Sequence, residues 1–385
     1  MEQKTKNAIS LEAFVFLALF LLFFGAIGSK MGISNMMQTM MATAYDLLLN
    51  TVLNIMAIAV VAGAISTVLS EFGVIALFNK IITPLMKPLY DLPGASSIGI
   101  LTTYMADNPA ILSLADDSNF KRYFKKYQFP ALTNLGTAFG MGLIVSTYML
   151  TVPLKGEKLG LAILIGNLGA VIGSIVSVRI MIHFTKKIFG TEEYCIPMDE
   201  KEAAAVLNTR NIRNGSVPAR ILEAMLDGGK SGVTVGVAII PGVLIICTLV
   251  MMLTYGPGDT GYTGAAYQGV AFFPWLGTKL SFILKPLFGF TSTSAISVPI
   301  TALGAAGAAI GLVPAMATAG AVHANDVAVF TAMCMCWSGY LSTHVGMMSA
   351  LKLPQLTGKA IISHTIGGLC AGISANLLFQ LFSMI

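Results

Sequence analysis

Long apolar runs separated by short polar stretches dominate the chain. A helix needs about 20 mostly apolar residues to cross a bilayer. On this basis the pattern predicts transmembrane helices at Phe14–Ile27, Thr51–Phe78, Gln128–Leu154, Gly160–His183, Val233–Tyr255, Asp326–Ala350 and Lys359–Ile385. The first of these is interpreted as an uncleaved anchor rather than a signal peptide. The Met-rich stretch Met31–Leu49 is predicted to form a separate amphipathic helix before the second span.

Two further apolar runs differ from these spans because each is rich in Gly, Ser, Thr or Pro and is broken near its middle. They are Gly94–Leu114 and Thr291–Val313. Such runs are typical of re-entrant helical hairpins, which are tolerated at membrane depth only when protein buries them or when they line a cavity. We therefore predict hairpins over 94–126 and 291–322. In the first, the run Ala106-Asp107-Asn108-Pro109 predicts that one helix stops and another restarts.

The two hairpins belong to an internal repeat with an offset of 198 residues. The run Lys87-Pro88-Leu89-Tyr90 parallels Lys285-Pro286-Leu287-Phe288, and the same offset pairs Gly160 with Gly358 and Gly169 with Gly367. One offset that holds over two separate clusters favours duplication over chance. The chain is therefore predicted to consist of two related halves.

Composition sets the environment of this repeat. Only 11% of the residues are charged and 55% are apolar, which is too little polar surface for a soluble protein of 385 residues. The formal charge of +5 comes without a basic stripe interleaved with aromatic residues, so no nucleic-acid partner is expected. With both hairpins returning to their own side, most of the 23 Lys and Arg residues fall on the side of the N-terminus, which the positive-inside rule makes cytoplasmic.

This topology inverts the two halves, because the first hairpin then opens from the cytoplasm and the second from outside. The predicted fold is an all-α polytopic membrane protein with inverted structural repeats, each with a re-entrant helical hairpin and a discontinuous transmembrane helix. The expected layout is an N-terminal transmembrane helix (1–30), a first repeat (31–183), a cytoplasmic linker (184–232) and a second repeat (233–385). Inverted repeats of this kind are typical of secondary transporters.

Asp107 and Asn108 are the leading candidates for chemistry, because an ionisable residue at mid-membrane depth is expensive and commonly functional. The alternative is that they only cap the returning helix. The spans after the hairpins have polar or Gly-rich centres, which are expected to unwind and to expose carbonyls for a cation. The predicted substrate-binding set is Asp107, Asn108, Asn134, Ser338, Ser342, Thr343 and His344.

Two further residue sets complete the predicted site. A coupling ion is expected at Asn134, Thr137 and Gly140. The hairpins and their gates are expected to use Ser96, Ser97, Pro109, Ser292, Thr293, Ser294, Gly304 and Gly307. At the second tip, Gly304 and Gly307 either present backbone N–H groups to a solute or allow close helix packing, and the sequence leaves both alternatives open.

Motifs for other chemistries are missing. The sequence has no GxxxxGK[ST], HExxH or GxSxG run, and its five cysteines lack metal-ligand spacing. We therefore predict no enzymatic activity, no catalytic residues, no bound metal and no cofactor apart from a coupling Na⁺ or H⁺.

The run from Pro84 to Ile98, with its echo around Lys285, resembles the Gate-domain ("nucleoside recognition") membrane-protein family, whose core is similar to that of the concentrative nucleoside transporters. In the latter, a polar triplet before a proline contacts the nucleobase, and Asp107-Asn108-Pro109 stands in the like position. Their Asn-Phe-Ser-Ser stretch, which holds the ribose, corresponds here to Ser338–His344 without the Asn. The resemblance also implies a homo-oligomer, with a trimer among the assemblies expected.

The leading functional hypothesis is a multi-pass protein of the cytoplasmic (inner) membrane with a cytoplasmic N-terminus. It would act as a symporter that couples Na⁺ or H⁺ to a small polar organic solute, such as a nucleoside or nucleobase, by alternating access. A passive channel or exporter is one alternative. The other is a structural or regulatory Gate-domain protein that transports nothing.

Overall fold

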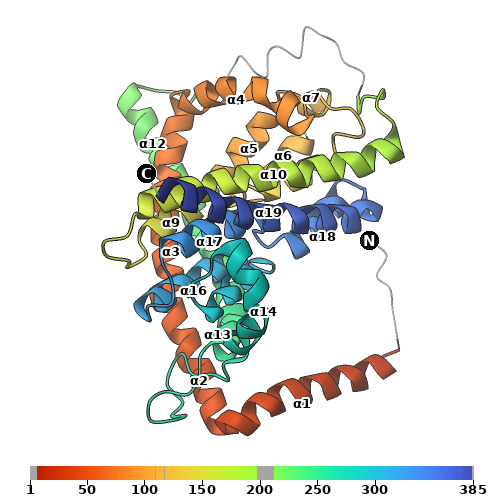
Figure 1. The fold of residues 1–385 in the computed structure, drawn as a ribbon. Helices are drawn as coiled ribbons and strands as arrows, with labels where there is room; N and C mark the ends of the chain where they lie inside the picture. The colour runs from red at the N-terminus through yellow and green to blue at the C-terminus, as the bar shows by residue number, and fades with distance from the viewer. Residues whose placement is uncertain (1–6, 109, 117, 197–211, 384–385) are drawn as a thin grey trace.

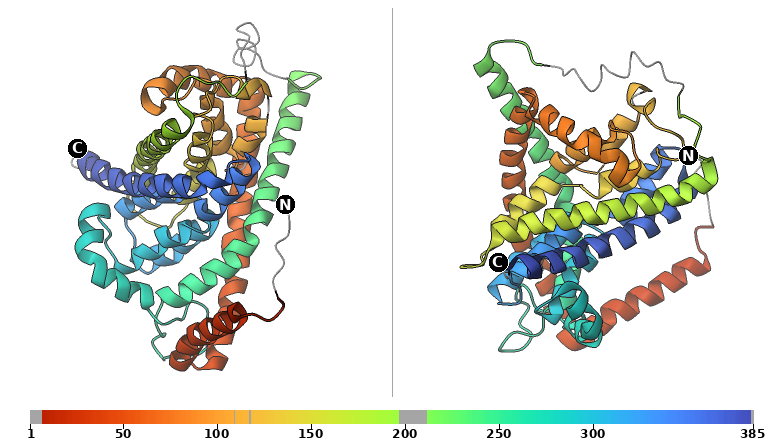
Figure 2. Two further views of the ribbon diagram at one scale, coloured as in Figure 1. Left: turned by 90° about the vertical axis from the view of Figure 1, so that its right-hand side faces the viewer. Right: turned by 45° about the horizontal axis from the view of Figure 1, so that its top comes forward.

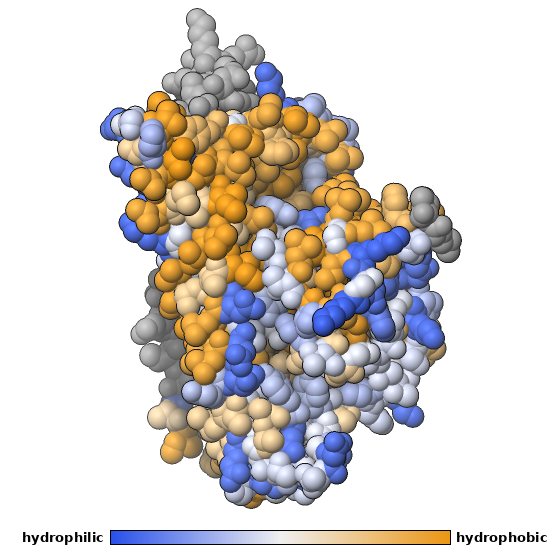
Figure 3. All heavy atoms as spheres, turned by 90° about the vertical axis from the view of Figure 1, so that its left-hand side faces the viewer, coloured by the Kyte–Doolittle hydropathy of each residue, from blue (hydrophilic) through white to orange (hydrophobic). Residues whose placement is uncertain are grey.

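The computed structural model describes residues 7–108, 110–116, 118–196 and 212–383. Its described residues form an assembly of helices in which five segments are long and apolar enough to cross a membrane. Apolar side chains cover much of one face (Figure 3), and large apolar residues such as Ile65, Leu222 and Leu226 are exposed. Lipid in place of water accounts for such a surface, as the composition predicts for a multi-pass membrane protein.

Two long helical segments run side by side along the height of the molecule (Figures 1 and 2). Each contains one π-helical turn. They are α2 (Ile33–Asp46) with η1 (Leu47–Val52) and α3 (Leu53–Glu71), and α12 (Val217–Gly242) with η2 (Val243–Cys247) and α13 (Thr248–Thr254). Glycine brings α3 and α12 together, since a Cβ on Gly63 would lie 2.5 Å from the backbone oxygen of Gly228.

A second pair of helices packs side by side across the middle of the molecule (Figure 1). It consists of α10 (Leu159–Phe189) and α19 (Thr357–Ser383), which lie side by side in both views of Figure 2. Their contact also depends on glycine, because a Cβ on Gly173 would lie 2.5 Å from the backbone oxygen of Gly367. The helix α17 (Ala324–Cys336) packs on both of them. The strongly apolar α1 (Leu11–Met31), charged only near its ends at Glu12 and Lys30, lies apart from this core over most of its length (Figure 1).

The remaining helices build the hairpins and the interrupted spans. In chain order they are α4 (Val74–Tyr90), α5 (Ser96–Met105), α6 (Ala110–Asp116), α7 (Ser118–Lys121), α8 (Ala131–Thr137), α9 (Gly142–Leu150), α14 (Phe272–Phe288), η3 (Thr293–Ile296), α15 (Ser297–Ala302), α16 (Ala306–Thr318), α18 (Tyr340–Ala350) and η4 (Pro354–Leu356). Both predicted helix interruptions are present, between α8 and α9 and between α17 and α18.

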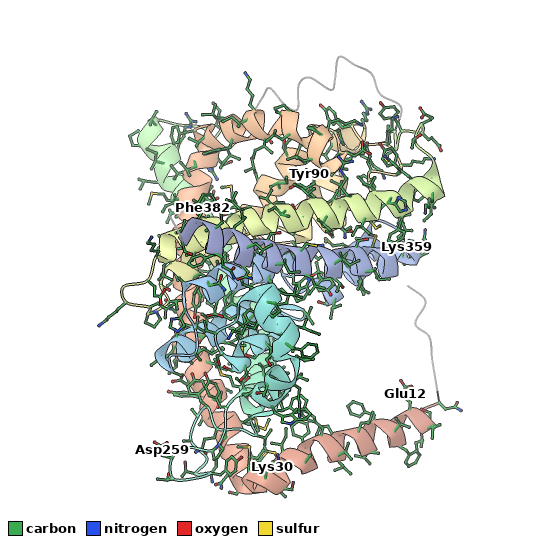
Figure 4. All side chains as sticks on the ribbon, viewed as in Figure 1. Glu12, Lys30, Tyr90, Asp259, Lys359 and Phe382 are labelled. Atoms are coloured by element: carbon green, nitrogen blue, oxygen red, sulfur yellow. The ribbon has the colours of Figure 1, made fainter. Side chains whose placement is uncertain are left out.

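The bounds of several elements recur at the offset found in the sequence. Shifted by 198 residues, α4 has the bounds of α14, and the first residues of α9 and α10 become those of α18 and α19. Helices α4 and α14 even end alike, at left-handed residues Asp91 (φ 57°) and Gly289 (φ 65°). The buried Tyr90, labelled in Figure 4, fixes the end of α4 through a 2.7 Å hydrogen bond between its hydroxyl and that of Ser174 on α10.

Three predicted boundaries were wrong. The stretch Met31–Leu49 is not a separate helix, because the π-helical turn carries it without a break into α3. The span Thr51–Phe78 ends early at Glu71, since Gly73 adopts φ 81° and α4 starts after it. The helices around the linker extend into it, α10 to Phe189 and α12 back to Val217, while residues 197–211 lie outside the described residues.

The start of α12 has a clear physical cause. Pro218 stands in its first turn, where a missing N–H costs nothing. The buried carboxylate of Glu71, at the end of α3, pairs with Arg213 at 2.9 Å and with Arg220 at 2.7 Å. Arg213 precedes α12 and Arg220 lies in it, so these ion pairs attach the beginning of α12 to the end of α3.

Candidate functional site

The tips of the two hairpins meet the two helix interruptions around one cavity of about 290 Å³. Helix α5 ends at Met105 and α6 begins at Ala110, so the first tip falls at the predicted motif. The second tip lies between α15 and α16. The residues around the cavity are Asp107, Asn108, Met141, Ala238, Ile239, Gly242, Gly304, Ala305, Ala306, Gly307, Ala308, Ser338, Gly339, Ser342 and Thr343.

Hydrogen bonds join the tips to the interruption between α17 and α18. The Asn108 side chain donates from Nδ2 to the backbone oxygen of Ser338 at 2.5 Å. The backbone N–H of Gly339 donates to the oxygen of Ala302, at the end of α15, at 3.0 Å. Gly339 can make this bond because it adopts φ 64°, a left-handed conformation that suits glycine. Segments more than 200 residues apart in the chain therefore share one site.

The first tip also contacts the interruption between α8 and α9. Gly140 has no side chain, and a Cβ placed on it would lie 1.3 Å from Oδ1 of Asn108. Only glycine leaves room for Asn108 at this point. The Oδ1 atom is buried without a hydrogen-bond partner among the described residues, and so is Oγ1 of Thr137, which ends α8. Two buried oxygens without donors therefore lie in or beside this interruption.

Seven of the predicted site residues line the cavity. They are Asp107, Asn108, Ser338, Ser342, Thr343, Gly304 and Gly307. The Asp107 carboxylate accepts a hydrogen bond at 2.7 Å from the backbone N–H of Asn108, and no described basic side chain lines the cavity beside it. The cavity thus brings a carboxylate, an amide and three hydroxyl groups to one place.

Asn134 and His344 are not among the cavity-lining residues. The Asn134 side chain donates to Oγ of Ser177 and to the backbone oxygen of Ala360, both at 3.0 Å. His344 is fully buried, and its Nδ1 donates to the backbone oxygen of Tyr340 at 3.0 Å. Its ring lies 4.8 Å, centroid to centroid, from that of His364. Asn134 therefore joins α8 to α10 and α19, and His344 packs α18 against α19.

The predicted gate serines lie at the bases of the hairpins, away from the tips. Ser96 donates to the backbone oxygen of Pro93 at 2.5 Å, and Ser97 donates to that of Gly94 at 2.7 Å and to the Asn79 side chain. Ser292, Thr293 and Ser294 line a second cavity of about 320 Å³ beside Tyr255. Pro109 lies outside the described residues.

Several lining residues were not predicted. Met141, Ala305, Ala306, Ala308 and Gly339 adjoin predicted positions, so the local motifs contained their signal. Three of them, Ala238, Ile239 and Gly242, come from α12. In this part of the sequence only an apolar span is visible, with no polar residue to mark a site. Only the tertiary packing of α12 against the second hairpin brings them to the cavity.

Comparison with known proteins supports the fold through structure alone. No protein-family model and no curated protein matches the sequence, so the Gate-domain resemblance stays a prediction. The chain is similar to the transporter CNTnw in an inward-facing substrate-bound state, with a TM-score of 0.55 and 15% identity over 96% of this chain and 85% of that one. A doubly substituted CNTnw in an outward-facing state gives 0.54 and 15% identity, over 96% and 86%.

A substituted CNTnw in its intermediate 2 state gives a TM-score of 0.53 and 15% identity over 98% of this chain and 95% of that one. The similarity therefore extends over almost the whole of both chains. At this level of identity it defines architecture only. The chain has the all-helical fold of the concentrative nucleoside transporter structures.

Proposed function

We propose that this protein is a secondary active transporter that moves a small polar organic solute, of the nucleoside or nucleobase kind, by alternating access. The observation that carries the proposal is the cavity between the two hairpin tips and the two helix interruptions, with Asp107 in its wall. Non-helical backbone inside a membrane is tolerated where it lines such a cavity. A carboxylate there is costly, and binding a solute is a function that offsets the cost.

The repeated architecture supports alternating access. Two halves in which several element bounds recur at one offset can exchange their conformations at little net cost, which gives two states of similar free energy. We propose that the halves are the inverted repeats 31–183 and 233–385 and that the N-terminus lies on the cytoplasmic side of the inner membrane. We also propose a homo-oligomer, which the fold similarity supports by analogy only.

Coupling to Na⁺ or H⁺ is the second part of the proposal. The orphan oxygens of Asn108 and Thr137, beside the interruption at Gly140, have the chemistry of ligands for a hard cation. Asn134 lies on α8 three residues before Thr137. Its amide N–H groups already donate to Ser177 and Ala360, so we propose it as a neighbour of the ion site and not as a free ligand. One charge moving across 100 mV supplies about 2.3 kcal/mol, enough for a roughly fiftyfold solute gradient.

Uptake by the full chain in proteoliposomes tests the proposal. Radiolabelled uridine, cytidine, adenosine, uracil and cytosine would be offered with an inward Na⁺ gradient, with a proton gradient and with neither. We expect at least one solute to accumulate above its external concentration under only one of the gradients. Equilibration that ignores both gradients would mean a passive channel. An absence of flux from protein that remains folded and monodisperse would favour a structural or regulatory role.

A further inference from the structure

The cavity presents many hydrogen-bond acceptors and few side-chain donors. The Asn108 amide has committed one of its two N–H donors, since a backbone oxygen can only accept and the 2.5 Å bond to the Ser338 oxygen therefore comes from Nδ2. The hydroxyl groups of Ser342 and Thr343 donate to the backbone oxygen of Gly339 at 3.2 and 2.9 Å. Hydroxyls bonded back to their own helix in this way offer only their lone pairs to a solute.

After these bonds, two lining side chains keep an uncommitted donor among the described residues, the second N–H of the Asn108 amide and the hydroxyl of Ser338. Asp107 adds a carboxylate, which as an ion accepts hydrogen bonds only. No described lysine, arginine or histidine lines the cavity to neutralise it. The side chains around the cavity therefore favour a partner that donates hydrogen bonds or carries positive charge.

Donors do come from the backbone, at the start of α16. This helix has 13 residues, and its N-cap is Ala305, which has no side-chain oxygen to accept from the first turn. Ala309 is the first residue here whose N–H has a backbone acceptor, the oxygen of Ala305 at 3.0 Å. The N–H groups of Ala306, Gly307 and Ala308 precede it, and all three residues line the cavity. This wall suits an electronegative atom of the solute.

On the basis of the proposed transport function, we infer that the site selects solutes with an amino or ammonium group facing Asp107 and a hydrogen-bond acceptor facing the start of α16. An amino group supplies the donors that Asp107 lacks. A carbonyl group in the same place would put two acceptors against each other and leave the half-buried Asp107 carboxylate without a donor, which is costly in a polar site. Anionic solutes would meet the same repulsion.

Matched pairs of solutes test this inference by binding to the purified full chain. The pairs are cytosine with uracil, cytidine with uridine, adenosine with inosine, and 2-aminoethanol with ethylene glycol, measured by thermal shift and by competition. We expect the amino member of a pair to bind at least about tenfold more tightly than its partner, the factor that corresponds to one hydrogen bond. In Asp107→Asn this ratio should fall towards one, because the amide can donate as well as accept. Asp107→Glu should keep the preference.

Asp259→Asn is the matched control. It makes the same chemical change in an exposed loop at the far end of the molecule, near Lys30 (Figure 4), and should leave the ratio unchanged. Tighter or equal binding of the carbonyl members, an unchanged ratio in Asp107→Asn, or binding of no solute in the panel would overturn the inference. Binding with the amino preference but no uptake under any gradient would instead overturn the transport function. The two failures are therefore distinguishable.

Discussion

The two hairpins share one backbone plan and differ in the chemistry at their tips. Their preceding helices α4 and α14 have the same bounds at an offset of 198 residues. The first tip contributes the side chains of Asp107 and Asn108 to the cavity, whereas the second contributes glycine and alanine. One hairpin thus offers side-chain groups to a solute and the other offers backbone. Two hairpins with one backbone plan can build an asymmetric site because only a few tip residues need to differ.

The interruptions differ in the same complementary way. Gly140 in the first half corresponds to Ser338 in the second. Gly140 has no side chain, so the Asn108 side chain can approach it, whereas Ser338 provides the backbone oxygen to which Asn108 donates. The polar tip therefore depends on both halves at once, and the following predictions test that dependence.

Gly140→Ala should have the largest effect. The new methyl would lie 1.3 Å from Oδ1 of Asn108, so the amide must leave and its bond to Ser338 is lost. Displacing a binding group by about 1 Å can cost a hundredfold, and we expect a loss of that order in solute uptake by proteoliposomes. The reciprocal change Ser338→Gly keeps the backbone acceptor and should cost less than about tenfold. Similar uptake by the two variants would contradict this account.

Gly339→Ala should come next. At φ 64° an alanine pays about 1–2 kcal/mol for the left-handed conformation, and its Cβ would lie 3.0 Å from the backbone oxygen of Gly304. We expect a lower thermal midpoint in detergent together with weaker uptake, because the second tip is pushed away. Gly339→Asn is the control, since asparagine tolerates this conformation better. If both substitutions lower the midpoint equally, backbone strain is not the cause.

The sequence predicted the elements that depend on local chemistry. The stop-and-restart motif marks the first tip because Asp and Asn favour helix starts, and the polar centres of the spans mark both interruptions. These signals lie within a few residues of the features they predict. The 198-residue offset also identified positions that correspond in the two halves, including the pair Gly140 and Ser338.

What the sequence could not predict depends on packing between distant segments. Nothing about Ile239 or Gly242 in an apolar helix indicates that α12 lies against the second tip. Asn134 and Asn108 are both polar residues within apolar stretches. Only the structure separates the amide that lines the cavity from the one bonded to Ser177 behind it. A list of polar residues by depth cannot make that distinction.

Ser97→Ala should have a moderate effect on stability. At the base of the first hairpin, the Ser97 hydroxyl lies 3.1 Å from that of Thr83 and contacts Asn79 of α4 as well. Losing this buried connection should cost about 1–2 kcal/mol. Among the described residues, the Ser294 hydroxyl at the base of the second hairpin hydrogen-bonds only to that of Ser292, at 2.8 Å. Ser294→Ala should therefore cost less than about 0.5 kcal/mol. Thermal unfolding of both variants in the same detergent checks this difference, and equal costs would contradict it.

Gly304→Ala should have the smallest effect, and it distinguishes two uses of glycine at the second tip. A Cβ on Gly304 would lie 3.6 Å from Cδ1 of Ile246, which is an ordinary van der Waals contact. The added methyl group therefore fits without moving the backbone. We expect uptake within about twofold of the parent, given that unstrained substitutions of this kind are usually tolerated. Gly307 is closer packed, with 3.2 Å to Cγ2 of Ile239 on α12, and Gly307→Val should reduce uptake about tenfold.

If instead Gly304→Ala abolished uptake while Gly307→Val did not, the second tip would need a flexible glycine hinge at Gly304 rather than close packing at Gly307. The tip would then act mainly by moving. The outcome we expect instead means that the second tip is a closely packed support. It holds the N–H groups of α16 in place while the side chains of the first tip select the solute.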